Sequence, residues 1–145
     1  MRKILILIAA AGLFAVGCSS GSSGSSSAPV SLSGTTNNKG TKDLQGNSAD
    51  LVIDDFSFSP SFIKGGTPGE TITVHLENKG QQLHNFTIKS QGIDKTLSPG
   101  DKIDVQLTLP PSGATGFHCR FHLQSNGMQG AFFFKDGDTV SSASS

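Results

Sequence analysis

Apolar and polar residues alternate in several short runs of this 145-residue chain, and each run ends at a turn-forming segment. The run TITVHLEN, residues 71–78, places Ile, Val and Leu on one face and polar side chains on the other, and KIDVQLTL, residues 102–109, repeats the pattern. A period of two is typical of a β-strand with one buried face. From Leu51 onward no convincing segment has the 3.6-residue period of an amphipathic helix, so the sequence predicts an all-β domain.

Turn signals separate these runs and predict about seven to eight short strands; they read SPS, GGTPGE, NKG, SPGD and PPSG. One sheet cannot bury its apolar face alone, so the strands must form two facing sheets. We therefore predict a two-sheet Greek-key β-sandwich over residues 50–138. Its core should rest on phenylalanine, because the chain has ten Phe residues and neither Trp nor Tyr.

The first 17 residues have the form of an export signal, with charges at Arg2 and Lys3 followed by an apolar run from Ile4 to Val16. This run is shorter than the roughly 20 residues that a membrane-spanning helix needs. The segment AVGC, residues 15–18, resembles the bacterial lipobox, whose cysteine carries a lipid on sulfur and becomes the mature N-terminus. The resemblance implies that Cys18 is a lipid anchor. The alternative is a plain secretory signal with an incidental cysteine.

The stretch that follows Cys18 is rich in Ser, Gly and small polar residues up to about residue 49. It has too few large apolar groups to offset the entropy of ordering, so residues 18–49 are predicted to be a flexible tether. Residues 139–145 are predicted to be a disordered tail. The domain would then be held at the extracytoplasmic face of a bacterial membrane, in the periplasm or at the cell surface.

Charge limits the range of partners. The chain carries 11 Lys and Arg residues against 11 Asp and Glu residues, and no basic stripe stands out. This balance argues against a nucleic-acid partner. We expect a monomer whose surface charge mainly serves solubility.

Cysteine usage is more informative. Cys18 and Cys119 are the two cysteines of the sequence, so acylation of Cys18 would leave Cys119 without an intrachain partner. An unpaired thiol outside the cytoplasm invites oxidation, which favours a chemical role for Cys119. The alternative is an inert buried thiol.

The loop CRFHLQSNGMQG, residues 119–130, carries three donor side chains: Cys119, His122 and Met128. The Cys-x-x-His spacing lets a tight turn aim a thiolate and an imidazole at one point. A thiolate, an imidazole and a thioether together suit copper, whereas zinc favours four strong ligands. A lone methionine is more often core filling, but Met128 is the only Met of the domain and shares this loop with its only Cys.

A copper centre with two histidines needs a second imidazole, and His84, near the start of the run LHNFTIK, is its natural source. The alternation turns His75 outward, and His118 lies on the opposite pleat face from Cys119. We therefore predict His75 and His118 to be surface residues. On its own, His84 would more often be a structural or exposed histidine than a ligand.

The segments LHNFTI, CRFHLQSNGMQG, PGETITVHLENKG and SPGDKIDVQL together resemble the type 1 (blue) copper proteins of the cupredoxin family. The resemblance covers roughly residues 50–136. It implies that His84, Cys119 and His122 are equatorial copper ligands, that Met128 is a long axial ligand, and that Asn85 ties the first ligand strand to the cysteine loop. Five residues separate His122 from Met128, one more than in plastocyanin-like members.

The resemblance implies a membrane-tethered carrier of single electrons, not an enzyme, that exchanges electrons with protein partners outside the cytoplasm. Phe121 and Leu123 would form a small docking patch around His122, although Phe121 could equally be a core residue. An alternative is a lipoprotein that sequesters or delivers copper. A copper oxidase or nitrite reductase would need further histidine ligands that the sequence lacks.

Overall fold

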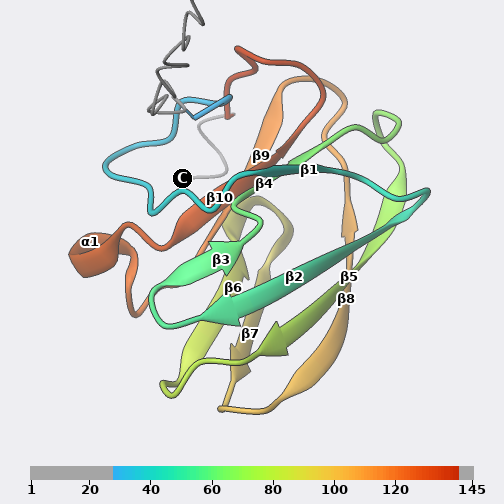
Figure 1. Ribbon diagram of the computed structural model, residues 1–145. Helices are drawn as coiled ribbons and strands as arrows, with labels where there is room; N and C mark the ends of the chain where they lie inside the picture. The colour runs from blue at the N-terminus through green and yellow to red at the C-terminus, as the bar shows by residue number, and fades with distance from the viewer. Residues whose placement is uncertain (1–27, 141–145) are drawn as a thin grey trace, which may run out of the picture.

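The computed structural model describes residues 28–140 as two β-sheets with two short helical turns (Figure 1). The strand order is β1-β4-β10-β9-β6-β7 in the first sheet and β3-β2-β5-β8 in the second. The six strands of the first sheet are β1 (Thr41–Asp43), β4 (Phe62–Lys64), β6 (His84–Ile88), β7 (Ile93–Leu97), β9 (Ala114–His118) and β10 (Gln129–Phe133). The four of the second are β2 (Ser48–Asp54), β3 (Ser57–Ser59), β5 (Thr71–Asn78) and β8 (Lys102–Thr108). The helical turns are the 3₁₀ turn η1 (Lys89–Gln91) and the single-turn helix α1 (Leu123–Asn126).

The main core lies between the two sheets, as the alternating runs predict. Strand β5 alternates exposed or half-buried residues with buried ones along its whole length, and its inward side chains Ile72, Val74 and Leu76 are buried. They join one cluster with residues of the first sheet such as Phe86 and Phe117. The predicted β-sandwich is therefore confirmed, with ten strands in residues 28–140 where about seven to eight were expected.

Phenylalanine rings fill the middle of this core. The ring of Phe117 contacts those of Phe58, Phe86 and Phe132, with centroid separations of 5.1, 5.2 and 5.3 Å. Aromatic pairs at this spacing add about 0.5–1.5 kcal/mol each beyond the burial of their area. Because Phe117 stands two residues before Cys119 on the same face of the sheet, this packing fixes the strand that leads into the cysteine loop.

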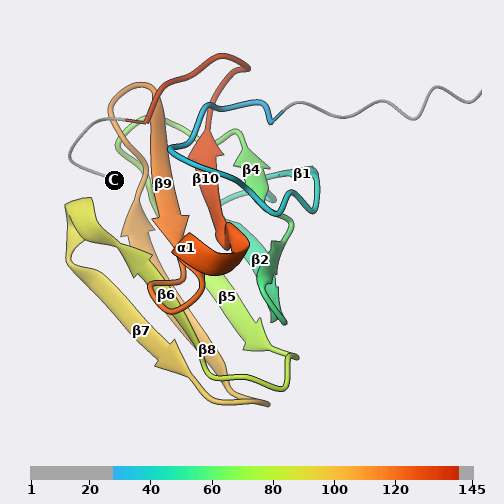
Figure 2. The same ribbon diagram turned by 90° about the vertical axis from the view of Figure 1, so that its left-hand side faces the viewer.

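The structure corrects the predicted tether in residues 28–49. Val30 is fully buried in a second cluster on the outer face of the first sheet, with Phe62, Ala114, Ala131 and Phe133. The chain then forms β1, which pairs in parallel with β4, and β2 begins at Ser48. Figure 2 shows this segment crossing over β10 before it reaches β1. The prediction failed because a few apolar residues, Val30 and Leu32 above all, suffice to hold a polar segment against an existing sheet.

Two further features concern the ends of the predicted domain. The run LVIDDFSF, residues 51–58, is a hairpin: β2 and β3 pair antiparallel around a turn at Asp55 and Phe56. At the other end, Thr139 pairs with Ser31 and Val140 with Ala114, so the predicted disordered tail is wrong for residues 139 and 140. The predicted signal (1–17), Cys18 and residues 141–145 lie outside the described residues. None of the helices within residues 28–140 has the length and hydropathy needed to span a bilayer.

Candidate metal centre

His84 occupies the first position of β6 and is fully buried. Its Nε2 atom lies 3.3 Å from Oδ1 of Asp55, in the β2–β3 turn. Its Nδ1 atom is also buried and has no hydrogen-bond partner within residues 28–140. A buried polar atom without a partner costs free energy, which indicates that this nitrogen is directed at a ligand.

Cys119 follows the last residue of β9 and is buried. Its backbone N–H donates to the carbonyl of Met128 at 2.9 Å, so the two ends of the loop are held together. Its own carbonyl accepts hydrogen bonds from the N–H groups of His122 and Leu123, at 3.1 and 2.9 Å. These bonds make the tight turn that the Cys-x-x-His spacing predicts, and the turn brings the thiol and the next imidazole to the same side.

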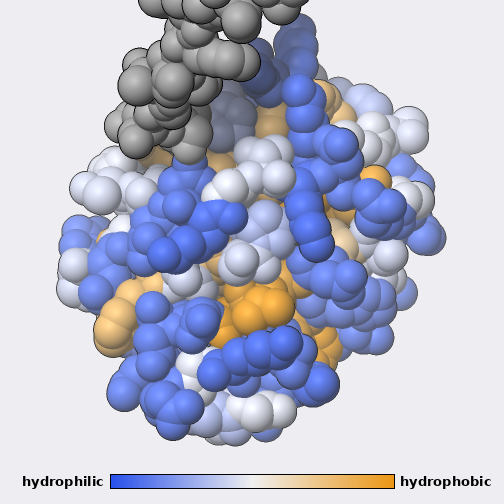
Figure 3. All heavy atoms as spheres, in the orientation of Figure 1, coloured by the Kyte–Doolittle hydropathy of each residue, from blue (hydrophilic) through white to orange (hydrophobic). Residues whose placement is uncertain are grey.

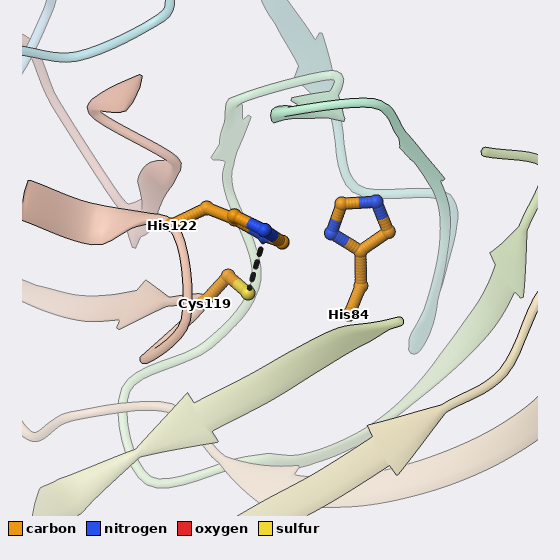
Figure 4. A group of neighbouring side chains, drawn as sticks. All are labelled: His84, Cys119 and His122. Atoms are coloured by element: carbon orange, nitrogen blue, oxygen red, sulfur yellow. Dashed lines mark hydrogen bonds between the residues drawn. The ribbon is translucent and has the colours of Figure 1, made fainter. Parts of the chain in front are cut away.

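His122 directly precedes α1 and is half-buried. Its Nδ1 atom lies 3.5 Å from Sγ of Cys119, and its ring centroid is 4.9 Å from that of His84. Three donor atoms lie within 4.8 Å of one another, one each from His84, Cys119 and His122. Figure 4 shows the ring nitrogen of His84 next to the branching carbon, Nδ1, turned toward the other two side chains. Folding therefore brings together the three strong ligands that the resemblance implies.

The ring of His122 is in the state that binds a metal. Burial lowers the pKa of His122, and the neighbouring His84 lowers it further, while Asp55 opposes the shift. The imidazole is thus neutral near pH 7 and offers a lone pair. Desolvation raises the pKa of Asp55, but hydrogen bonds from His84 and from the backbone of Gln81 and Gln82 outweigh it, so this carboxylate stays ionised.

The donor set fits a copper ion. One thiolate and two imidazoles match the trigonal ligand set of blue copper sites, and the Nδ1 of His84, which has no hydrogen-bond partner among the described residues, is the nitrogen that such an ion would use. Met128 is fully buried in the same core cluster as Cys119, and its carbonyl pairs with the Cys119 N–H. Its role as axial ligand remains a prediction.

Asn85 makes the connection that the resemblance implies. Its Oδ1 atom accepts a hydrogen bond from the backbone N–H of Arg120, the residue after Cys119, at 3.4 Å. Its Nδ2 atom donates to Oδ1 of Asp94 at 2.5 Å and to the carbonyl of Lys95 at 3.3 Å. Asn85 therefore ties β6 to the cysteine loop on one side and to β7 on the other.

The remaining histidines lie apart from this cluster. His75 is exposed, as predicted, and pairs with Asp104 at 2.6 Å. His118 is only 7% exposed, so the prediction that it lies at the surface is wrong. It does face away from Cys119, but the N-terminal segment covers that face: His118 lines a cavity of about 570 Å³ together with Ser33, Thr35 and Lys89. Burial lowers its pKa.

Sequence reasoning missed two residues that contact the histidines of this cluster, Asp55 and Phe56. Asp55 contacts His84, and Phe56 places its ring edge against the rings of His122 and His84, at 4.9 and 6.4 Å between centroids. Phe56 holds a left-handed backbone conformation with φ 68°, which is uncommon for a bulky residue. The adjacent aspartates that interrupt the alternation in LVIDDFSF are the signal for this turn.

The comparisons with known proteins agree with this geometry. A family model described as a cupredoxin-like domain matches residues 24–132. The chain therefore belongs to the cupredoxin-like family. This confirms the family resemblance seen in the sequence and agrees with copper as the cofactor. No curated protein matches the sequence.

Among solved structures, the fold is similar to two auracyanins, of which auracyanin A is named a blue copper protein, and to a metal-binding domain. Dithionite-reduced auracyanin from Roseiflexus castenholzii is 18% identical, with a TM-score of 0.53 over 61% of this chain and 97% of that chain. Auracyanin A from Chloroflexus aurantiacus is 13% identical, with a TM-score of 0.51 over 66% and 100%. The metal-binding domain of a Cu(I)-exporting P-type ATPase from Streptococcus pneumoniae is 12% identical, with a TM-score of 0.52 over 71% and 98%. At these identities the likeness shows the fold alone.

Proposed function

We propose that this chain is a type 1 copper protein that carries single electrons between redox proteins outside the cytoplasm, anchored to a bacterial membrane through Cys18. The observation that carries the proposal is the convergence of one thiol and two imidazoles within 4.8 Å, with the His84 Nδ1 atom buried and lacking a hydrogen-bond partner within residues 28–140. The similarity of fold to two auracyanins, one named a blue copper protein, supports it.

The protein would act by holding its ligands still. Copper, when bound, supplies a one-electron couple between Cu(II) and Cu(I). His84 is the first residue of β6, Cys119 directly follows β9, and both are fully buried, so neither can move far when the charge of the site changes. His122, Cys119 and Met128 are joined by backbone hydrogen bonds within one loop. Rigid ligands keep the reorganisation of the site small, which is what fast electron exchange requires.

His122 is the ligand through which electrons would enter and leave. Its half-buried ring stands at the surface end of the cluster, and Phe121 beside it is 43% exposed. Leu83, beside the other histidine, is 47% exposed, and these two are the exposed large hydrophobic side chains of residues 28–140. Figure 3 shows one face of the molecule, on which hydrophilic side chains prevail around a smaller hydrophobic area. Leu123 is half-buried and lines the cavity beside His118, which makes Leu83 a better candidate than Leu123 for a docking patch with Phe121.

We further propose that the chain is a carrier and not an enzyme. Within residues 28–140 one group of His and Cys side chains is close enough to hold an ion, and a fourth donor from Met128 would leave no strong position for a substrate. The second candidate function is copper sequestration or delivery. It is favoured by the similarity of fold to the metal-binding domain of a Cu(I)-exporting ATPase.

The test is an optical and paramagnetic-resonance spectrum of the copper-loaded full chain. The proposal expects an intense sulfur-to-copper charge-transfer band that disappears in Cys119→Ser. Repeated reduction and reoxidation without loss of copper supports the carrier, whereas rapid transfer of copper to an acceptor protein supports delivery. A copper-loaded wild-type protein without the band would contradict both the ligand set and the carrier.

A further inference from the structure

The N-terminal segment contacts the metal loop directly. Residues 33–37, here called the strap, lie outside the sandwich and were predicted from sequence to be part of a flexible tether. They run alongside the segment from Gly127 to Gln129 that carries Met128, and hydrogen bonds connect the two. The two neighbours of Met128 in the sequence are both hydrogen-bonded to the strap, Gly127 through its backbone carbonyl and Gln129 through its side-chain amide.

Gln129 forms the first connection. Gln129 is 7% exposed, and its Nε2 atom donates to the carbonyls of Ser33 and Thr35, both at 2.9 Å, and lies 3.2 Å from Oγ1 of Thr36. An amide nitrogen that meets this many oxygens in a buried position fixes its own side chain and the backbone that bears it. The residue after Met128 is therefore fastened to the strap.

Asn37 forms the second connection. Its backbone N–H donates to the carbonyl of Gly127 at 2.8 Å, and its side-chain Nδ2 donates to the carbonyl of Phe56 at 3.0 Å. Phe56 is the residue in the left-handed conformation whose ring contacts both His122 and His84. One strap residue thus holds the backbone before Met128 and the backbone of the aromatic residue that packs on the two imidazoles.

The fit between strap and loop is close. A Cβ atom on Gly127 would lie 2.5 Å from the carbonyl oxygen of Thr35, too near for any side chain. Gly127 also has φ 63°, a conformation that glycine adopts without strain. The loop therefore approaches the strap as closely as two backbones can, and a shift of either would break several hydrogen bonds at once.

We propose that the strap positions Met128 against His84, Cys119 and His122, with Gln129 and Asn37 as positioning residues for the metal centre. The inference rests on the proposed copper function. It also means that residues 33–37, which follow the predicted anchor at Cys18 in the sequence, are part of the metal centre's support, so the properties of the bound copper depend on a segment outside the sandwich.

The test compares Gln129→Leu and Asn37→Ala with the matched control Gln91→Leu in the full chain. Gln91 also bonds backbone groups through its side-chain amide, donating to the Thr108 carbonyl and accepting from the Thr108 N–H, both at 2.8 Å, but neither partner belongs to the metal loop. Loss of a supporting contact typically costs 10–100-fold in metal affinity, so both strap variants should lose copper to a chelator about 10-fold faster than the control. Their reduction potential and charge-transfer band positions should shift, and those of Gln91→Leu should match the wild type.

A second measurement, on the copper-free protein, does not depend on the proposed function. Hydrogen exchange at the Cys119 amide, which is bonded to the Met128 carbonyl, should speed up in Gln129→Leu and Asn37→Ala and stay unchanged in Gln91→Leu. If the wild-type protein lacks the copper band, the proposed function fails. The exchange measurement alone then shows whether the strap holds the loop that carries Met128. Strap variants that match the control in copper loss, potential and amide exchange overturn the inference. If circular dichroism shows that Gln129→Leu does not fold, the test of the strap's positioning role rests on Asn37→Ala, which keeps the backbone hydrogen bond to Gly127.

Discussion

The Nε2 atom of His84 lies 3.3 Å from the Oδ1 atom of Asp55, while the Nδ1 atom of the same ring has no hydrogen-bond partner within residues 28–140. Because the Asp55 carboxylate is ionised and can only accept, the proton of the neutral ring belongs on Nε2. The lone pair of Nδ1 then points at Cys119 and His122. A residue in the turn between β2 and β3 thus selects the tautomer that binds a metal.

Replacing Asp55 should weaken copper binding. In Asp55→Ala the ring of His84 loses the acceptor that fixes its proton and orientation, so copper affinity should fall about 10-fold or more. Competition with a chelator of known affinity measures the change. Asp104→Asn removes the carboxylate partner of the exposed His75 and serves as the control with unchanged affinity. Equal affinities in Asp55→Ala and wild type would show that Asp55 does not support the ligand.

Gly127→Ala should destabilise the fold more than a matched glycine change. At Gly46, φ is 60° and no atom lies within 4 Å of a new Cβ, so Gly46→Ala should cost only the strain of a left-handed residue, about 1–2 kcal/mol. Gly127→Ala adds the clash with the Thr35 carbonyl, and overpacking typically costs about 1–3 kcal/mol more. Urea unfolding of the copper-free proteins measures both. A Gly127→Ala variant no less stable than Gly46→Ala would mean that the strap is easily displaced.

The pair of His75 and Asp104 should make stability depend on pH. The hydrogen bond that His75 donates to Asp104 raises the pKa of His75 above its usual value, partial desolvation opposes the rise, and the charges of Asp104 and of Asp50 on the neighbouring strand add to it. A raised folded-state pKa means that the stabilisation is fully present below the unfolded value of about 6.5 and is lost as the pH rises through the folded value.

The difference in unfolding free energy between wild type and Asp104→Asn should therefore be larger at pH 6 than at pH 8. Both pH values lie above the range in which carboxylates protonate, so the histidine accounts for the change. A proton NMR titration of His75 checks the cause, because Asp104→Asn should lower its pKa. A difference that does not vary with pH would rule out this pair as a source of pH dependence.

Polar substitutions at the exposed apolar residues should slow electron exchange without altering the copper site. Leu83→Gln and Phe121→Gln remove apolar area beside the two histidines while leaving His84 and His122 in place. The rate constant for reduction by a physiological protein partner should fall, and the copper spectrum should stay the same. Leu123→Gln, at a half-buried position, tests the site predicted from sequence. Unchanged rates in all three variants would place the docking surface elsewhere.

Membrane association should depend on Cys18, which lies outside the described residues. Cys18→Ala removes the sulfur that the lipobox resemblance predicts to be acylated, so the protein should move from the membrane to the soluble fraction. Cell fractionation with detection of the folded domain measures this. A wild-type protein found entirely in the soluble fraction would refute the anchor.

Several features of this protein could be predicted from local sequence. The alternation in residues 71–78 and 102–109 fixed which side chains face the core, because side-chain direction in a strand has a strict period of two. The Cys-x-x-His spacing predicted that Cys119 and His122 meet, since four consecutive residues can close only a tight turn. The choice of His84 over His75 also followed from alternation together with the family resemblance.

Sequence alone determined the residue types of the metal centre and the faces of its strands, because both depend on neighbours along the chain. Tertiary structure decided what packs on those faces: that residues 33–37 lie against the metal loop, that His118 is covered, and that Asp55 and Phe56, in a turn of the second sheet, contact His84 in the first. Contacts between segments 28 or more residues apart depend on strand order and register, and no periodicity within a segment specifies which other segment will cover it.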